Sequence, residues 1–193
     1  MKVAIIRYNA GNIRSVDFAL KRLGVRAAIT DDHQKISQAD RVIFPGVGEA
    51  KSTMAYLRAR GLDRLITSLE QPVLGVCLGM QLMCRWSEER NTACLDIIPS
   101  SVLHFKGGMK VPHMGWSRIS DLKSPLFEGI PEGAYVYFVH SYYLPQNPYT
   151  IAHAHHGMPF SAAVENGRFY AVQFHPEKSG PIGAQILKNF LSL

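Results

Sequence analysis

The chain has 193 residues, of which 47% are hydrophobic and 19% are charged, and this fits one domain with its own core. No apolar run approaches the roughly 20 residues of a membrane-spanning helix, so no membrane contact is expected. The net charge is +6 at pH 7, but the basic residues are dispersed along the chain. This dispersal favours a solvated basic surface over a nucleic-acid-binding one.

The cysteines and histidines give no sign of a disulfide framework or a metal site. The three cysteines are Cys77, Cys84 and Cys94. An odd number argues against paired disulfides and favours a reducing cytoplasm. A small cluster, AHAHHG, predicts a strand with His153 and His155 on one face. No paired metal-ligand spacing is present, so we expect neither a metal nor a cofactor.

The first part of the chain alternates between predicted strands and helices. The run KVAIIR (residues 2–7) is expected to be a buried first strand rather than a signal peptide. Asn12 can cap a helix over residues 13–23, whose apolar positions share one face. Two further strands are predicted at residues 25–29 and 40–44. This alternation predicts a parallel sheet wrapped by helices.

A glycine-rich loop, Pro45-Gly46-Val47-Gly48, follows the third strand directly. Ligand loops of open α/β sheets gather at the carboxyl ends of strands. Taken alone, the loop is more typical of a plain strand-to-helix turn, before helices predicted at 49–60 and 62–70. Beside a nucleophile on a neighbouring strand, the backbone N–H of Val47 becomes a candidate donor to an oxyanion.

The stretch PVLGVCLGMQLMCRW (residues 72–86) carries the strongest chemical signal. An apolar strand leads to Cys77 between glycines, and Leu78, Leu82 and Trp86 follow at helical spacing. This pattern indicates a nucleophile elbow with a thiol at the tip of a tight turn, beside a helix N-terminus that favours the reactive thiolate. The backbone N–H of Leu78 is then free to hold an oxyanion. An ordinary buried cysteine is the alternative.

The second half adds short strands and a last helix. Asn166-Gly167 is a hairpin signal, and Pro181 marks the start of the final helix. The predicted fold is therefore an α/β, flavodoxin-like open sheet, mostly parallel with added antiparallel strands and helices on both faces. The predicted strands are 97–98, 102–105, 116–119, 134–140, 150–154, 161–164 and 169–174.

A base and its orienting group follow the last predicted strand, in Phe174-His175-Pro176-Glu177. His175 and Glu177 are two residues apart in a segment that Pro176 is expected to keep extended, so their side chains lie on one side. Cys77, His175 and Glu177 are the residue types needed for a nucleophile, a base and an orienting carboxylate.

The loop PGVG, the elbow GVCLGMQ and the segment FHPE occur in the order typical of class I glutamine amidotransferases, and the chain resembles that family from end to end. Residues 1–193 are then expected to form a single domain of this family. Four further stretches, YNAGNIRSV, KVPHMGW, FVHSYY and QFHPEKSG, resemble the glutaminase subunits of imidazole glycerol phosphate synthases. Asn9 and Ser117 depart from this pattern, where we expect Gly and Asn.

The resemblance implies hydrolysis of L-glutamine through a thioester on Cys77, with Gln81 and the backbone of Ser141 and Tyr142 holding the substrate. It also implies a partner, a cyclase subunit with a (β/α)₈ barrel, which receives the ammonia for histidine biosynthesis. Asn12 and Lys178 flank the expected active-site edge of the sheet. We therefore predict that both lie at or near the contact with the cyclase.

Three other functions remain open at this point. The glutaminase subunit of pyridoxal phosphate synthase shares the triad but does not account for KVPHMGW and HSYY. A free-standing cysteine hydrolase of γ-glutamyl peptides is a second alternative. A flavodoxin-like, non-enzymatic interaction module is the third, although Cys77, His175 and Glu177 argue against it.

Overall fold

A computed structural model describes residues 1–8 and 12–193 of the chain, so Asn9 lies outside the described residues. Its centre is a seven-stranded sheet with the strand order β11-β12-β13-β4-β3-β1-β2. The five strands from β13 to β2 are parallel, and β12 and β11 extend the sheet antiparallel, as predicted. The strands are β1 (Val3–Ile6), β2 (Ala27–Thr30), β3 (Arg41–Phe44), β4 (Val73–Val76), β11 (Thr150–His156), β12 (Met158–Asn166) and β13 (Phe169–Val172).

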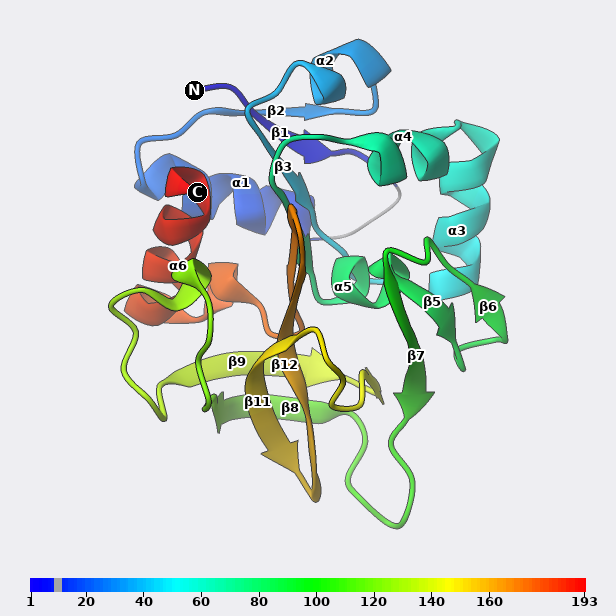
Figure 1. Ribbon diagram of the computed structural model, residues 1–193, viewed down its shortest axis with the longest axis vertical. Helices are drawn as coiled ribbons and strands as arrows, with labels where there is room; N and C mark the ends of the chain where they lie inside the picture. The colour runs from blue at the N-terminus through cyan, green and yellow to red at the C-terminus, as the bar shows by residue number, and fades with distance from the viewer. Residues whose placement is uncertain (9–11) are drawn as a thin grey trace.

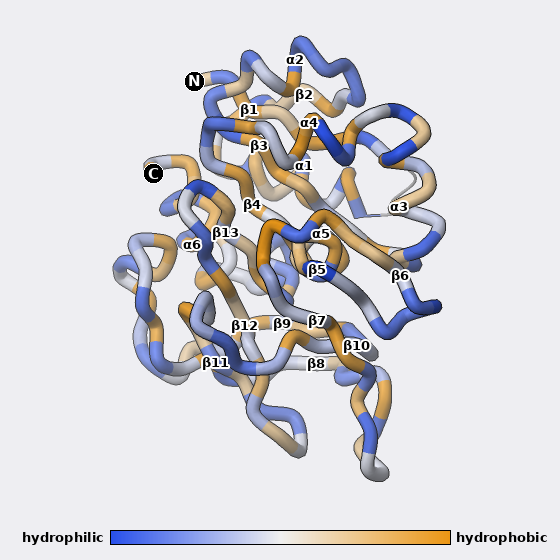
Figure 2. Tube along the Cα trace, turned by 45° about the vertical axis from the view of Figure 1, so that its right-hand side comes forward, coloured by the Kyte–Doolittle hydropathy of each residue, from blue (hydrophilic) through white to orange (hydrophobic). Residues whose placement is uncertain are grey.

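Helices cover both faces of this sheet, which confirms the predicted α/β architecture (Figure 1). The apolar faces of α1 (Ile13–Arg22) and α6 (Gly180–Ser192) pack on one side. Four helices pack on the other side: α2 (His33–Ser37), α3 (Ala50–Ala59), α4 (Leu62–Ser68) and α5 (Leu78–Met83). Because both faces are covered, the central strands are apolar throughout. Every residue of β4 is buried, and the central strands and α5 appear mostly hydrophobic in Figure 2.

Two smaller sheets accompany the main sheet. One has the order β10-β7-β5-β6, and the other pairs β8 with β9. Their strands are β5 (Cys84–Ser87), β6 (Thr92–Ala93), β7 (Ile98–His104), β8 (His113–Arg118), β9 (Tyr135–His140) and β10 (Tyr142–Tyr143). Two 3₁₀ turns complete the elements, η1 (Pro125–Phe127) and η2 (Pro176–Lys178). Within residues 1–8 and 12–193, every helix is too short or too polar to span a lipid bilayer.

The elbow helix is shorter than its sequence pattern predicts. The spacing of Leu78, Leu82 and Trp86 indicates one continuous helical face, but α5 ends at Met83. Cys84 is extended, with φ −70° and ψ 173°, and begins β5. Strand β5 pairs with β6 and β7. The hydrogen bonds of this small sheet override the local helical pattern, so the prediction of a helix through Cys84 and Trp86 is wrong.

Two other local differences have visible causes. Strand β2 begins at Ala27 instead of residue 25, because the N–H of Val25 closes the end of α1 by donating to Leu20 O at 3.0 Å. The sequence patterns did not reveal α2, which is one short turn. Asp32 caps its N-terminus, and the Asp32 carboxylate accepts from the N–H of Lys35 at 2.9 Å.

The fold makes a prediction about Gly79, in the first turn of α5. A Cβ atom added at Gly79 would overlap the carbonyl oxygen of Phe44, at the end of β3. In an exposed helix, replacing Gly by Ala stabilises by about 1 kcal/mol. Here we expect Gly79→Ala to lower the free energy of unfolding by about 1 to 3 kcal/mol, because β3 and α5 must separate.

Urea denaturation of the full chain measures this change. Lys51→Ala, on the exposed side of α3, is the control and should leave the free energy of unfolding nearly unchanged. A neutral or stabilising effect of Gly79→Ala would show that the contact between β3 and α5 is not tight.

Candidate active site

The carboxyl ends of the parallel strands bring together residues that are distant in the sequence. Tyr8 follows β1, Gly46 follows β3, Cys77 follows β4, and His175 lies three residues after the end of β13. In a parallel sheet these ends share one edge, which is where ligands of open α/β folds bind. The structure therefore assembles the glycine loop, the thiol and the base at one edge.

Cys77 has the strained backbone of a nucleophile elbow. Its φ of 53° and ψ of −107° are unusual for a residue with a side chain. The turn is tight because Gly79 lies against the Phe44 carbonyl, and Gly75 is close to Met83 and to the backbone of residues 79 and 80. This geometry holds Cys77, which is 6% exposed, at the tip of the turn between β4 and α5.

His175 and Glu177 form the expected pair, but the backbone between them differs from the predicted extended conformation. Nδ1 of His175 lies 2.8 Å from Oε1 of Glu177, and both side chains are fully buried. Residues 176–178 form the 3₁₀ turn η2, so the segment is not extended. The turn brings the carboxylate back under the ring. Nδ1 must donate to the carboxylate, which leaves Nε2 to act as the base.

Asn12 supports this pair. The sequence suggested a helix cap, but the Asn12 side chain makes no capping hydrogen bond. Its Nδ2 donates instead to Oε1 of Glu177 at 3.0 Å, and the residue is 6% exposed. Asn12 thus helps to fix the carboxylate that orients His175, a contact between residues 165 positions apart that no sequence pattern indicated.

The ring of His175 lies between Glu177 and Cys77. Burial is the largest influence on the pKa of His175 and lowers it, but contacts with Cys77 and Glu177 outweigh burial and raise the pKa to about 10. Nε2 has no hydrogen-bond partner within residues 1–8 and 12–193, and the Cys77 thiol donates to the carbonyl of Val139 at 3.8 Å. A ring that keeps its proton favours a thiolate–imidazolium pair, from which a Cys–His nucleophile attacks.

A cavity of about 330 Å³ opens beside Cys77, of a size suited to a small molecule such as an amino acid. Six of the seven residues predicted to hold the substrate or its oxyanion line it: Val47, Gly48, Leu78, Gln81, Ser141 and Tyr142. Gly46 is not among the lining residues. No role was predicted for the four other lining residues, which are Glu89, Pro112, Val139 and His140. Pro112 belongs to the KVPHMGW stretch, and Val139 and His140 belong to FVHSYY, so only Glu89 lacked a sequence signal.

The glycine loop adopts a conformation that occupies one predicted oxyanion donor. The N–H of Leu78 donates to the carbonyl of Gly46 at 3.3 Å. Since N–H and C=O point in opposite directions across a trans peptide, the N–H of Val47 faces away from Leu78. Tyr8 also contacts the loop, because its hydroxyl donates a hydrogen bond to the carbonyl of Pro45. The two predicted donors therefore do not converge in this conformation.

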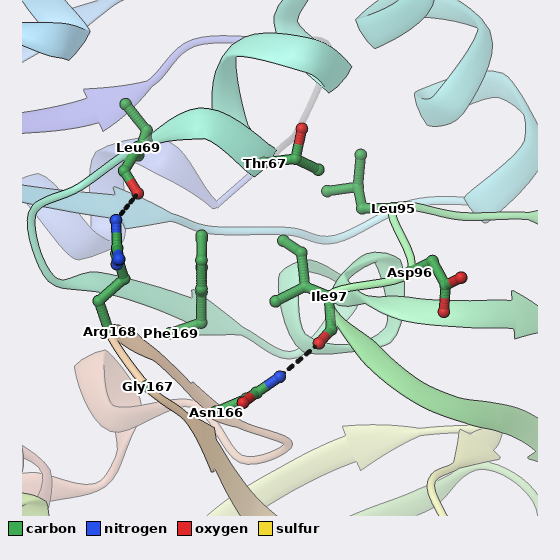
Figure 3. Close-up of a pocket in the computed structure, with 9 residues that line it drawn as sticks. All are labelled: Thr67, Leu69, Leu95, Asp96, Ile97, Asn166, Gly167, Arg168 and Phe169. Atoms are coloured by element: carbon green, nitrogen blue, oxygen red, sulfur yellow. Dashed lines mark hydrogen bonds between the residues drawn. The ribbon is translucent and has the colours of Figure 1, made fainter.

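A second cavity, of about 450 Å³, lies at the opposite edge of the sheet, around the amino ends of β4 and β13 (Figure 3). Two backbone carbonyls in its wall are already paired: Asn166 donates to Ile97 O at 2.8 Å, and Arg168 donates to Leu69 O at 3.2 Å. No residue of the predicted site lines it. Among the described residues, no group of three His, Cys, Asp or Glu side chains is placed to hold a metal ion.

The two predicted interface residues have different surroundings. Asn12 is buried against Glu177, whereas Lys178 is exposed, with Nζ 5.8 Å from the centre of the Tyr137 ring. Tyr137 lies on the outward side of β9, opposite Trp116 of β8. Met114 and Trp116 on β8 and Tyr135 on β9 are 62%, 54% and 48% exposed, and we call these three residues with Tyr137 the β8–β9 face.

Comparisons with known proteins agree with this architecture. The family model described as "Glutamine amidotransferase class-I" matches residues 5–193. A crystal structure of a glutamine amidotransferase has a TM-score of 0.77 at 18% identity, with 100% of this chain and 98% of the other covered. A glutamine amidotransferase from Thermotoga maritima has a TM-score of 0.64 at 18% identity, with 100% of this chain and 81% of the other covered. At these identities the likeness concerns the fold.

Curated relatives are much closer in sequence. An imidazole glycerol phosphate synthase subunit HisH from Bacteroides fragilis is 60% identical over 196 residues, with 100% of both chains covered. The HisH subunit from Salmonella typhimurium is 47% identical, again with 100% of both chains covered. The chain therefore belongs to the class I glutamine amidotransferases and, within them, to the family of imidazole glycerol phosphate synthase HisH subunits.

Proposed function

We propose that this chain is the glutaminase subunit of an imidazole glycerol phosphate synthase and that it hydrolyses L-glutamine through a thioester on Cys77. The observation that carries the proposal is the convergence of Cys77, His175 and Glu177 beside a cavity of amino-acid size. Residues 1–193 act as one amidotransferase domain. The three cysteines are free thiols, which suits a reducing cytoplasm.

The reaction has two stages. The sulfur of Cys77 attacks the side-chain carbonyl carbon of glutamine, and His175 gives its proton to the leaving nitrogen, which departs as ammonia. A water molecule, deprotonated by His175, then cleaves the thioester and releases glutamate. Glu177, held by Asn12, keeps the His175 ring oriented in both stages.

The substrate lies between Gln81 and the segment Ser141–Tyr142. Nε2 of Gln81 donates to the carbonyl of Tyr142 at 3.0 Å and to Oε1 of Gln173 at 3.0 Å. Both of its N–H groups are thereby used, so Oε1 of Gln81 is the atom left to accept a hydrogen bond from the ammonium group of glutamine.

The glycine loop controls the oxyanion donors. Rotation of the Gly46–Val47 peptide releases the N–H of Leu78 from the Gly46 carbonyl and turns the N–H of Val47 toward the reacting carbon. Gly48, with φ of +130° and open space around it, permits this rotation. The loop as described is thus a resting state, and a partner or a substrate that favours the rotated peptide raises the rate.

The partner is a cyclase subunit with a (β/α)₈ barrel, which docks over the β8–β9 face and Lys178. Three large hydrophobic side chains are exposed together there, and Val139 of the same strand also lines the cavity. An exposed apolar surface of this kind is typical of a protein contact. Ammonia then passes to the cyclase without entering water, where most of it would be protonated, and becomes part of the imidazole ring in histidine biosynthesis.

The triad can be tested by substitution. We expect Cys77→Ala to lower glutamine hydrolysis at least about a hundredfold and His175→Ala to do nearly as much damage, because the triad acts as a unit. Cys94→Ala removes a thiol that does not line the cavity, so it should keep wild-type activity. Unfolding curves check that the variants fold. Activity of Cys77→Ala above a few per cent of wild type would rule out the thioester mechanism.

The glycine loop can be tested at Gly48. A β-branched residue resists a φ of +130°, so Gly48→Val should lower turnover by about 10²-fold, the usual loss when an oxyanion donor is removed. Iodoacetamide labelling of Cys77 needs no oxyanion donor and should change much less. Gly129→Val, at another positive φ with open space, is the control. Equal losses of turnover and labelling would mean that the loop is structural.

The docking surface can be tested with two substitutions. We expect Lys178→Ala and Trp116→Ala to lower glutamine-dependent synthesis by the complex at least about tenfold, equivalent to 1.4 kcal/mol, because each removes a contact with the cyclase. Synthesis from added ammonium salt should stay largely intact, since it bypasses this subunit. Ile29→Ala, on the edge strand β2, is the control. Wild-type synthesis by both variants would place the cyclase elsewhere.

A further inference from the structure

Gln173 is a fully buried polar residue for which the two reaction stages above assign no role. It lies directly after β13, two residues before His175, and none of its surface is exposed. A buried amide is costly unless its donors and acceptor are paired. Its side chain lies between Cys77 and Gln81: Oε1 is 3.0 Å from Nε2 of Gln81, and Nε2 is 3.6 Å from the sulfur of Cys77.

The orientation of this amide follows from its neighbours. The backbone carbonyl of Tyr142 can only accept, so the group of Gln81 that faces it must be the NH₂. The second N–H of that NH₂ group faces Gln173, so Gln173 must present its oxygen there. Its own NH₂ group then faces the sulfur of Cys77. The carbonyl of Tyr142 thereby fixes the orientation of both side-chain amides, that of Gln81 and that of Gln173.

The two polar contacts of the sulfur favour opposite protonation states. The carbonyl of Val139, at 3.8 Å, can only accept, so it pairs with the protonated thiol. Nε2 of Gln173 can only donate, so its hydrogen bond strengthens when the sulfur becomes a thiolate. A hydrogen bond to the charged form of a group favours that form.

We propose that Gln173 is a further catalytic residue, which stabilises the Cys77 thiolate by donating an amide hydrogen bond and links the sulfur to the glutamine-binding amide of Gln81. This inference rests on the proposed role of Cys77 as the nucleophile. Glutamine bound at Gln81 then holds Gln173, and through it the sulfur, in the position for attack.

Other titratable groups near the sulfur stay in place when Gln173 is changed. His175 faces it from the segment after β13, and Tyr8 faces it from the end of β1. Three further titratable residues line the same cavity: Glu89 after β5, His140 at the end of β9 and Tyr142 in β10. A change in the reactivity of the sulfur in a Gln173 variant therefore reports the amide itself.

The test measures alkylation of Cys77 in the full chain by iodoacetamide as a function of pH, with the modified peptide identified by mass. Gln173→Met removes the donor while keeping the side-chain length. We expect the midpoint of the alkylation profile to rise by about one pH unit, the shift that corresponds to one hydrogen bond to a charged group. We also expect kcat for glutamine to fall about tenfold.

Two variants separate this role from a structural one. Gln81→Met removes the substrate contact and also the donor that orients Gln173, so it should raise KM for glutamine and raise the alkylation midpoint by less than Gln173→Met does. Gln71→Met removes a comparable amide hydrogen bond, to Ile36 O at 2.9 Å, from the opposite end of the sheet. It should leave the midpoint, kcat and KM unchanged.

If Gln173→Met does not fold, Gln173→Glu replaces it, because a carboxylate keeps the acceptor for Gln81 and loses the donor to the sulfur. The midpoint should then rise by at least as much. An unchanged midpoint in the variant that folds would overturn the inference. The alkylation profile does not depend on glutamine hydrolysis, so hydrolysis by Cys77→Ala would overturn the proposed function separately.

Discussion

The close contact between α5 and the end of β3 is the constraint on which the site depends. Gly79 lies against the carbonyl of Phe44, with no room for a side chain, and this contact holds Cys77 at a φ of 53°. A backbone strained in this way costs about 1 to 3 kcal/mol and persists only where its surroundings hold it. The buried strand β4 and the fully buried helix α5 supply that support. The thiol, the loop donors and the cavity all take their positions from this turn.

A second constraint is the carbonyl oxygen of Tyr142, where two chains of hydrogen bonds meet. Gln81 donates to it from one side, and Nδ1 of His140 lies 2.8 Å away on the other. Burial lowers the pKa of His140 to about 3, outweighing that hydrogen bond, and it lowers the pKa of His113 to about 4. Both rings are therefore neutral at pH 7 and have a single direction of donation. His113 donates to His140 and accepts from Ser117.

These fixed directions matter for the substrate. The hydrogen bonds of His113 and His140 hold the backbone of residues 140–142, which forms one wall of the cavity. They also orient the side-chain amides of Gln81 and Gln173 beside Cys77. The chain of hydrogen bonds also reaches β8, the strand that carries Met114 and Trp116. The β8–β9 face is therefore connected to the carbonyl of Tyr142 by hydrogen bonds that run through only two histidines.

The sequence predicts the parts of this protein that depend on local pattern. Alternating strands and helices predict the parallel sheet, the glycines around Cys77 predict the elbow, and Asn166-Gly167 predicts the hairpin between β12 and β13. The parts that depend on distant pairing are not predictable in this way. Strand β5 takes its conformation from β6 and β7, and Asn12 and Gln173 take their roles from contacts with Glu177 and Cys77.

The conformation of the glycine loop also lies beyond local pattern. Gly46 and Gly48 indicate a loop that can rotate, but the hydrogen bond between Leu78 and the Gly46 carbonyl selects one of its states. Tyr8, whose pKa is raised by burial, then holds the same loop from β1. Such contacts between sequence-distant groups decide which of several locally acceptable conformations is adopted.

The most direct test of the account is to trap the covalent intermediate. The full chain is mixed with glutamine, quenched in acid during turnover and digested, and the masses of the cysteine-containing peptides are measured. A thioester on Cys77 predicts a glutamyl group on the peptide that contains Cys77 and none on those that contain Cys84 or Cys94. Glutamine hydrolysis with a glutamyl group on another cysteine, or with Cys77 never modified, would contradict it.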